Sequence, residues 1–285
     1  MAVFRLLLLA VAAISVALLV VVFVSQRRFR VQVDGEVRAL FAGDASSVGP
    51  AELAARWDSL PEPVKRHLRY CIPAGAPAIR SARLRHGGAF RPSPKQGWFP
   101  IRGEQYFTVG KPGFIWNATI RMPPGLWVEA RDCLAGERGN MLVRVLSTLT
   151  VADAKGPAMD QGGAMRWLAE AVWFPYALVG DRVAWEPVDE RSARATLRYG
   201  GPPASLVFTL DDQGRFALVR GERYNETEGR MRAWRGACRD YREFGGFRVP
   251  TAIEAVWELD SGDYSYARFQ VTQLEYGVEQ RFPAR

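Results

Sequence analysis

The chain has 285 residues, 48% of them hydrophobic, which is enough for one or two domains with a well-buried core. Its formal net charge of +8 would suit binding to nucleic acid or to anionic lipid. The basic residues, however, are scattered along the chain, form no Lys/Arg block and accompany no nucleic-acid-binding motif, so we predict no nucleic-acid partner.

The N-terminal segment predicts a membrane anchor. Residues 6–24, LLLLAVAAISVALLVVVFV, contain no charge, and Ser15 is their only polar side chain. A run of this length crosses a bilayer as a helix. It is longer than the apolar part of a usual signal peptide, and no small-residue cleavage motif follows it. We therefore predict that residues 1–30 are an uncleaved, single-pass anchor, with residues 6–24 inside the inner (cytoplasmic) membrane.

The charges that flank this segment bear on its orientation. Arg27, Arg28 and Arg30 follow it, whereas Arg5 and the α-amine precede it. The positive-inside rule then favours a cytoplasmic domain. The architecture expected for the rest of the chain is typical of secreted proteins and favours the other side. We predict an extracytoplasmic domain, with the cytoplasmic side as the alternative.

Two short helices are expected before the first strand. Residues 31–60 read as a tether that contains a short helix at Ala51–Trp57, and a second helix is expected at Pro61–Tyr70, where a proline suits the first turn. His67 lies near the apolar side of this second helix. A lone histidine there is more often a surface or hydrogen-bonded core residue than a ligand.

From Ile79 onward, alternating hydrophobicity predicts strands. In Gly113–Met122, alternate residues from Phe114 to Met122 are apolar, which is typical of a strand with one buried and one wetter face. Further strands are expected at residues 79–90, 98–109, 126–132, 140–146, 206–210, 216–218, 253–259 and 264–276. The turns between them are mostly short, so we expect about ten strands paired antiparallel.

One segment in the second half of the chain is strongly helical. In Gly162–Leu178, the residues Met165, Leu168 and Val172 recur at helical spacing, and Pro175 ends the pattern. We expect this helix to lie across the sheet. The fold class is therefore mainly β with helices (α+β), and residues 61–285 form a single β-rich globular domain because no composition shift divides them.

The motifs of common catalytic and cofactor sites are absent from the sequence. Its two histidines, His67 and His86, have no carboxylate at ligand spacing, and neither HExxH, GxSxG, GxGxxG nor a P-loop occurs. We predict no metal, no cofactor and no assigned catalytic residue. Cys71, Cys133 and Cys238 are either three separate buried thiols or one disulfide with a free thiol.

Carboxylates are the remaining candidates for chemistry. Glu129, Asp132 and Glu170 could meet in space, and an enzyme of unassigned class would need such a pair in a cleft. Glu170 also follows Arg166 by four residues, and an ion pair on the helix surface is the competing interpretation.

Aromatic residues suggest an apolar cavity. Large apolar side chains on strands under a helix can line a cavity for an apolar ligand, and they can equally fill a large core. The residues that we expect to line a cavity are Phe114, Trp116, Trp127, Trp173 and Trp257. The polar candidates are Arg91, Gln105, Asp132 and Glu170.

Several motifs in order resemble a bacterial family of unknown function that often follows a membrane span, of the DUF6544/DUF6920 type. They are LPEPVKRHLRY at residues 60–70, GAFR at 88–91, QYF at 105–107, PGFIW at 112–116 and RWLAEAVWFP at 166–175. The resemblance covers about residues 60–276 and implies no activity and no catalytic residues.

More distantly, the layout is similar to LolA- and LolB-like proteins. That resemblance implies a curved antiparallel half-barrel with helices on its concave face, and by analogy a lipid or lipoprotein ligand. From it we predict a membrane-anchored protein that binds a lipid or acyl chain. A structural or assembly partner in the cell envelope and an enzyme of unassigned class remain the alternatives.

Overall fold

The centre of the molecule is one antiparallel sheet of thirteen strands. The computed structural model describes residues 2–44, 46–225 and 227–283. The strands are β1 (Ser81–Phe90), β2 (Phe99–Thr108), β3 (Gly113–Met122), β4 (Leu126–Ala135), β5 (Arg138–Val145), β6 (Leu149–Lys155), β7 (Val183–Pro187), β8 (Ser192–Leu197), β9 (Ala204–Leu210), β10 (Phe216–Asn225), β11 (Arg230–Phe244), β12 (Phe247–Leu259) and β13 (Gly262–Tyr276). Their order across the sheet is β6-β5-β4-β3-β2-β1-β13-β12-β11-β10-β9-β8-β7.

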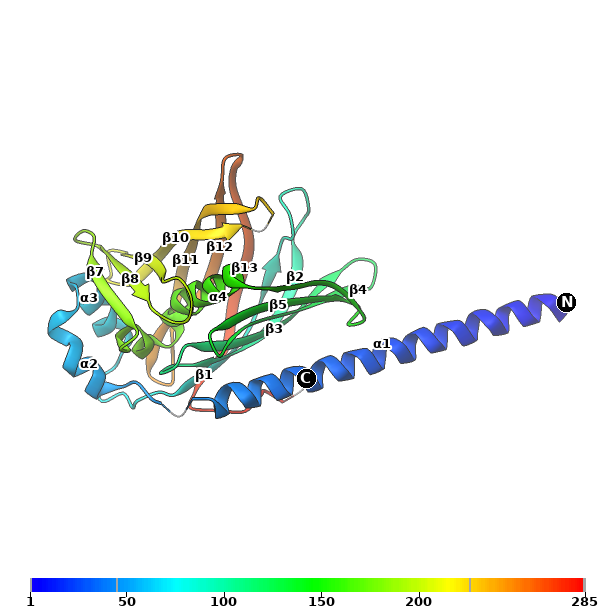
Figure 1. Ribbon diagram of the computed structural model, residues 1–285, viewed down its shortest axis with the longest axis horizontal. Helices are drawn as coiled ribbons and strands as arrows, with labels where there is room; N and C mark the ends of the chain where they lie inside the picture. The colour runs from blue at the N-terminus through cyan, green and yellow to red at the C-terminus, as the bar shows by residue number, and fades with distance from the viewer. Residues whose placement is uncertain (1, 45, 226, 284–285) are drawn as a thin grey trace.

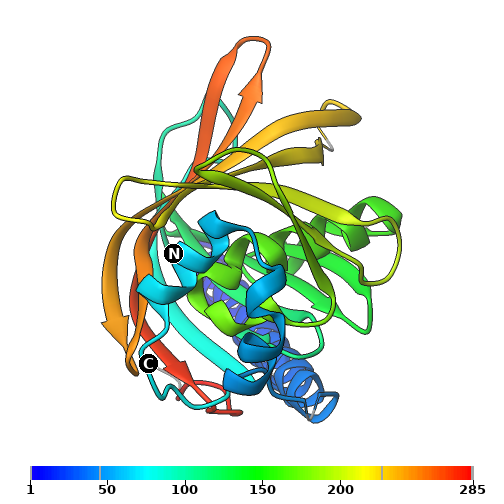
Figure 2. The same ribbon diagram turned by 90° about the vertical axis from the view of Figure 1, so that its left-hand side faces the viewer.

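The sheet curves into a half-barrel that holds most of the helices on its concave side (Figures 1 and 2). It stays open because, in the part of the chain that the structure describes, the edge strands β6 and β7 do not pair with each other. The helices are α1 (Ala2–Ala42), α2 (Pro50–Arg56), α3 (Glu62–Cys71) and α4 (Pro157–Glu170), with 3₁₀ turns at Trp57–Ser59, Ala171–Trp173 and Pro175–Val179. This confirms the predicted fold class, a mainly β half-barrel covered by helices.

Helix α1 projects far beyond the sheet, as Figure 1 shows. The helix from Val3 to Ala42 contains a stretch that is long and apolar enough to cross a membrane. The side chains of its first half, from Val3 to Leu19, are exposed. This matches the apolar segment that the sequence predicts at residues 6–24.

The second half of α1 packs on the convex face of the sheet. Phe29, Val33 and Val37 follow one another at four-residue steps and are almost fully buried, because they share a cluster with Ile115 of β3 and Tyr106 of β2. Two ion pairs add to the contact, Glu36 with Arg131 at 3.1 Å and Asp34 with Arg281 at 2.8 Å. The structure thus differs from the expected tether, because residues 31–42 continue the helix and are docked on the sheet.

Strand β3 has the bounds that the alternation predicts, Gly113–Met122. Phe114, Trp116 and Ile120 point into the concave side and are buried. Ile115 on the other face is also buried, with 1% of its surface exposed, because α1 covers it. Four strands lie outside the expected ranges: β6, β7, β8 and β11. The first three are short and lie at or near the open edges of the sheet, whereas β11 is long and lies within it.

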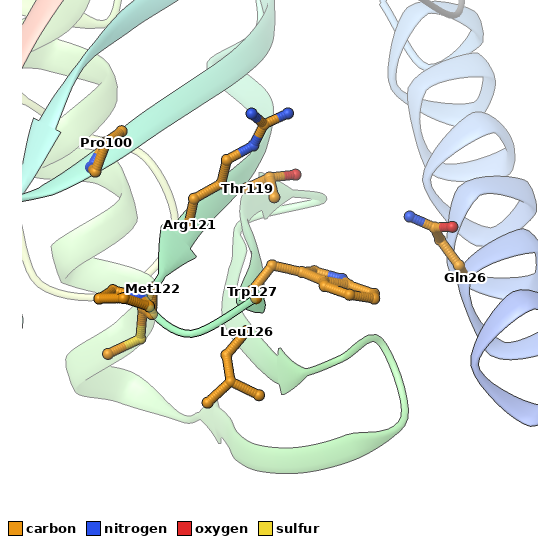
Figure 3. Close-up of a pocket in the computed structure, with 9 residues that line it drawn as sticks. Gln26, Pro100, Thr119, Arg121, Met122, Leu126 and Trp127 are labelled. Carbon is orange, nitrogen blue, oxygen red and sulfur yellow. The ribbon is translucent and has the colours of Figure 1, made fainter. Parts of the chain in front are cut away.

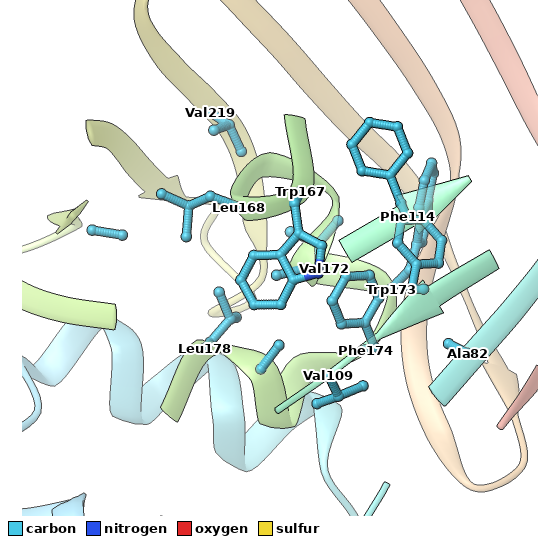
Figure 4. Close-up of a cluster of buried hydrophobic side chains, with 14 of the residues drawn as sticks. Ala82, Val109, Phe114, Trp167, Leu168, Val172, Trp173, Phe174, Leu178 and Val219 are labelled. Atoms are coloured by element: carbon cyan, nitrogen blue, oxygen red, sulfur yellow. The ribbon is translucent and has the colours of Figure 1, made fainter. Parts of the chain in front are cut away.

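Helix α4 begins at Pro157, five residues before the expected start, and ends at Glu170. The expected boundary was wrong because Gly162 and Gly163 lie inside the helix, where Gly163 lets it approach Leu134 of β4. Beyond Glu170 the chain continues in 3₁₀ turns. The core is centred on this segment, and Figure 4 shows Trp167, Phe174 and Leu178 in the buried cluster. The ring of Phe174 packs on that of Phe107 of β2, with 4.6 Å between the centroids.

Two buried histidines accept hydrogen bonds from the core. Nδ1 of His67 accepts the backbone N–H of Phe216 at 3.0 Å, and Nε2 of His86 accepts the indole N–H of Trp116 at 2.9 Å. An acceptor nitrogen carries no proton, so each ring is held neutral. Burial lowers the pKa of His67 to about 3, against a smaller opposite effect of Asp211, and it lowers the pKa of His86 to about 4. His67 is therefore a hydrogen-bonded core residue.

Lowering the pH from about 6.5 toward 4 is expected to destabilise the folded domain. In this window the unfolded chain protonates both histidines and the folded chain does not, so each one lowers the free energy of unfolding by about 1.4 kcal/mol per pH unit. Urea unfolding of the full chain in detergent at several pH values measures this slope. His86→Gln should reduce the slope by about half, and an unchanged slope in the variant would contradict the assignment.

Candidate functional site

A cavity of about 810 Å³ lies between the concave face of the sheet and α4. Its walls come from β3, β4 and β5 on one side and from β10 to β13 on the other, and they are mostly apolar. Aromatic rings from three strands, those of Trp116, Trp234 and Trp257, contribute to this lining. The volume lies within the usual range for small-molecule sites, about 300–1,000 Å³.

Small residues at inward positions create this hollow. Gly236 of β11 pairs with Ala255 of β12, and Ala255 pairs with Ala267 of β13, so three small residues lie side by side across the sheet. All three line the cavity. Because side chains on one face of a sheet stand next to each other across strands, Ala255 and Ala267 leave space above them. The indole of Trp234 lies over Gly236, 3.1 Å from the position that a Cβ atom would take.

One charged cluster lies in the wall of the cavity. Arg166 of α4 donates from Nη1 to Asp132 Oδ2 at 2.6 Å and from Nε to Glu170 Oε1 at 3.0 Å. Gln105 donates from Nε2 to Glu170 Oε2 at 2.6 Å. The guanidinium lies over the rings of Phe114 and Trp116, 5.1 and 4.7 Å from their centroids. Asp132 and Glu170 thus converge, but they do so on a cation that binds both.

Burial governs the protonation of this cluster. It raises the pKa of Glu170, while the adjacent Arg166 acts in the opposite direction. The pKa of Arg166 is raised despite burial, because the two carboxylates stabilise its charge. The Arg166–Glu170 pair exists as the four-residue spacing suggests, but it is buried, with 14% of each side chain exposed, and does not lie on the helix surface.

The cavity opens at the end of the half-barrel from which α1 leaves. The turns β1–β2, β3–β4, β5–β6, β10–β11 and β12–β13 all lie at this end, since neighbouring strands are antiparallel and Phe90 pairs with both Phe99 and Ala267. Residues in or next to four of these turns line the cavity, among them Gln96, Met122, Glu228 and Leu259.

A second, shallower pocket of about 600 Å³ marks where α1 passes the β3–β4 turn. Gln26 of α1 lines it together with Arg121 and Trp127, and Figure 3 shows Trp127 pointing toward the helix. Gln26 follows the apolar segment 6–24 by two residues. Met122 lines both pockets, so the mouth of the cavity lies next to the end of that segment.

Five of the nine residues expected at the site line the cavity. They are Trp116, Trp173, Trp257, Asp132 and Glu170. Trp116, Asp132 and Trp257 reach the cavity because alternate residues of β3, β4 and β12 face the concave side. Glu170 and Trp173 lie at the end of α4 and in the 3₁₀ turn that follows it.

The other four lie elsewhere. Phe114 is fully buried below Arg166, and Gln105 reaches the site through its hydrogen bond to Glu170. Arg91 stacks on Trp98 and Tyr264 at the rim. Trp127 lies on the convex side, where its indole N–H donates to Ser147 at 3.2 Å, because its strand neighbour Val128 takes the inward position.

Glu129 also faces the convex side, so it does not join Asp132. Sequence reasoning missed Arg223, Trp234 and Phe269, which line the cavity. For the two aromatic residues the signal was present, since alternating residues of β11 and β13 include Trp234, Gly236 and Cys238, and Ala267 and Phe269.

In the part of the chain that the structure describes, no three His, Cys, Asp or Glu side chains gather as metal ligands. Cys71, Cys133 and Cys238 are buried free thiols. Burial raises the pKa of Cys238 to about 12 and that of Cys133 to about 11, so both are held as unreactive thiols.

Comparison with known proteins gives a family and a set of similar folds. The model described as "Family of unknown function (DUF6544)" matches residues 52–269, which confirms the resemblance seen in the motifs. No curated protein sequence matches the chain.

Three solved structures are similar at low identity. A LolA superfamily protein from Nitrosomonas europaea has 10% identity and a TM-score of 0.41, over 78% of this chain and 93% of that one. A DUF1329 family protein from Desulfovibrio piger has 11% identity and a TM-score of 0.42, over 76% and 92%. A domain provisionally assigned to outer membrane lipoprotein sorting from Vibrio parahaemolyticus has 10% identity and a TM-score of 0.36, over 76% and 89%.

Proposed function

This chain belongs to the family of unknown function DUF6544, and we propose that it is a membrane-anchored protein that binds a lipid or the acyl chain of a lipoprotein in its concave cavity. The observation that carries the proposal is the cavity itself, about 810 Å³ in volume and mostly apolar in its lining. Apolar surface gains free energy when it leaves water, at about 25 cal/mol per Å², and a hydrocarbon chain would cover this lining.

The position of the mouth supports a ligand from the membrane. In this proposal residues 6–24 are the anchor, and the mouth lies at the same end of the domain, next to Gln26 and Trp127. Tryptophan is common at membrane–water interfaces, where its ring is apolar and its N–H remains hydrated. A lipid would then pass between the bilayer and the cavity over a short path.

In this proposal the anchor lies in the inner membrane and the domain lies on the extracytoplasmic side. Docking of α1 through Phe29, Val33 and Val37 would hold the domain at a fixed distance from the bilayer surface, since the helix is continuous from Ala2 to Ala42. The domain would therefore act near the membrane that anchors it.

The full chain is expected to retain one lipid when native mass spectrometry strips the detergent micelle from it. Lipid that merely surrounds the anchor is removed first, because it has no enclosed site. A peptide of residues 1–42 is the control, and it should retain none under the same conditions. A full chain that retains no more lipid than this peptide would contradict the proposed function.

A further inference from the structure

Arg223 stands in the cavity wall between β10 and α4. It lines the cavity together with Val219, four residues earlier on the same strand. Its guanidinium carbon lies 5.4 Å from the ring centroid of Trp234 and 5.8 Å from that of Trp257, two residues that pair directly across β11 and β12. On the other side Nη2 approaches Gly162 of α4, where a Cβ atom would lie 3.6 Å away.

Among the described residues, Arg223 has no carboxylate partner and its buried Nε has no hydrogen-bond partner. Among the residues that the structure describes, two acidic side chains near the mouth are already bound. Glu228 accepts from Arg232 at 2.5 Å and from Arg230 at 3.1 Å, and Asp260 accepts from the same two arginines. Arg166 in turn is neutralised by Asp132 and Glu170.

A guanidinium that is partly buried without an anion is costly, since burial removes its water and the two indole faces compensate only in part. Its planar donors match a carboxylate or a phosphate, which they bind through two parallel hydrogen bonds. The described carboxylates of the lining, Asp132, Glu170 and Glu228, are each paired with another arginine, and the rest of the lining is mostly apolar. An anion that enters with an apolar ligand would supply the partner that the described residues do not provide.

We propose that Arg223 binds the anionic head, a carboxylate or a phosphate, of an amphipathic lipid whose hydrocarbon part lies in the cavity. This inference rests on the proposed function and specifies its ligand. Trp234 and Trp257 hold the guanidinium in place, and Arg166 does not bind the head because its charge is already paired with Asp132 and Glu170.

A competition between two lipids of equal chain length tests the head group. The full chain in detergent micelles is equilibrated with oleic acid and oleyl alcohol at a pH at which the acid is ionised, and native mass spectrometry measures the bound ratio. We expect the wild-type chain to prefer the acid by about tenfold or more, because a charge-assisted pair forms with the acid alone.

Arg223→Met should remove this preference. Its affinity for the alcohol should stay within about twofold of the wild-type value, since methionine retains the apolar stem. Arg223→Lys should restore part of the preference. Arg220→Met is the matched control, because Arg220 lies on the same strand, is more than half exposed and does not line the cavity. It should behave as the wild type.

Two outcomes would overturn the inference. Equal binding of acid and alcohol by the wild-type chain, or an unchanged preference in Arg223→Met, would show that Arg223 does not bind the head, and the proposed function would survive. If no form binds either lipid, the proposed function fails as well. Adding oleoyl lysophosphatidate to the competition separates the two anions, since the tighter binder identifies a phosphate or a carboxylate head.

Discussion

Arg166→Met is expected to lower the free energy of unfolding by about 3–5 kcal/mol, the usual cost of removing one partner from a buried ion pair. The variant leaves Asp132 and Glu170 in the cavity wall, 8% and 14% exposed, without the cation that binds both of them. It also removes the guanidinium from the rings of Phe114 and Trp116. Urea unfolding of the full chain in detergent, followed by tryptophan fluorescence, measures the loss.

Two further variants separate charge from packing. In the triple variant Arg166→Met, Asp132→Asn, Glu170→Gln no unpaired charge remains, so most of the lost stability should return. Glu170→Gln alone should cost about 1 kcal/mol, the value of a single hydrogen bond, because Asp132 still pairs with Arg166. A loss below about 1 kcal/mol in Arg166→Met would mean that water in the cavity hydrates the carboxylates, and the cluster would then not be structural.

The sheet could be predicted from the sequence wherever one face of a strand is buried and the other is wetter. Strand β3 is the clearest case, and the hairpin around Gly214, whose φ of 78° favours glycine, is another. The short strands at the edges, such as β6 with its mostly exposed residues, carry too little apolar pattern to predict.

The docking of α1 could not be predicted, although its apolar stripe is present in the sequence. Phe29, Val33 and Val37 recur at helical steps, but the surface that they cover, including Ile115 and Tyr106, belongs to strands from a distant part of the chain. The alternation on β3 places Ile115 on the wetter face, so nothing local indicates that a helix buries it. Contacts with residues far away in the sequence therefore determine where α1 packs.

Contact with α1 also explains why Trp127 was wrongly expected in the cavity. Strand β4 is buried on both faces from Glu129 to Leu134, because the cavity lies on one side and α1 on the other. Its hydrophobic pattern therefore does not show which face is concave. Trp116 and Trp257 could be predicted because their strands alternate clearly, whereas Trp127 lies on the convex side.

Filling the cavity is expected to abolish ligand binding while it stabilises the fold. Ala255 and Ala267 pair across β12 and β13 and both line the cavity. In Ala255→Phe, Ala267→Phe the two rings would occupy the space of a hydrocarbon chain, so lipid retained in native mass spectrometry should fall at least about tenfold. The ligand-free chain should gain about 1–2 kcal/mol, because the new rings are buried against apolar walls that were open.

The sign of the stability change separates a ligand cavity from a core that is already filled. If the side chains already filled this region, two added rings would force strain and cost about 1–3 kcal/mol. Ala184→Phe on β7 is the control, since Ala184 is exposed and outside the cavity, and it should change neither lipid retention nor stability. Loss of stability without loss of lipid would place the ligand elsewhere. Loss of lipid with a gain in stability would mean that the small side chains of Ala255 and Ala267 keep the cavity open at a cost to the fold.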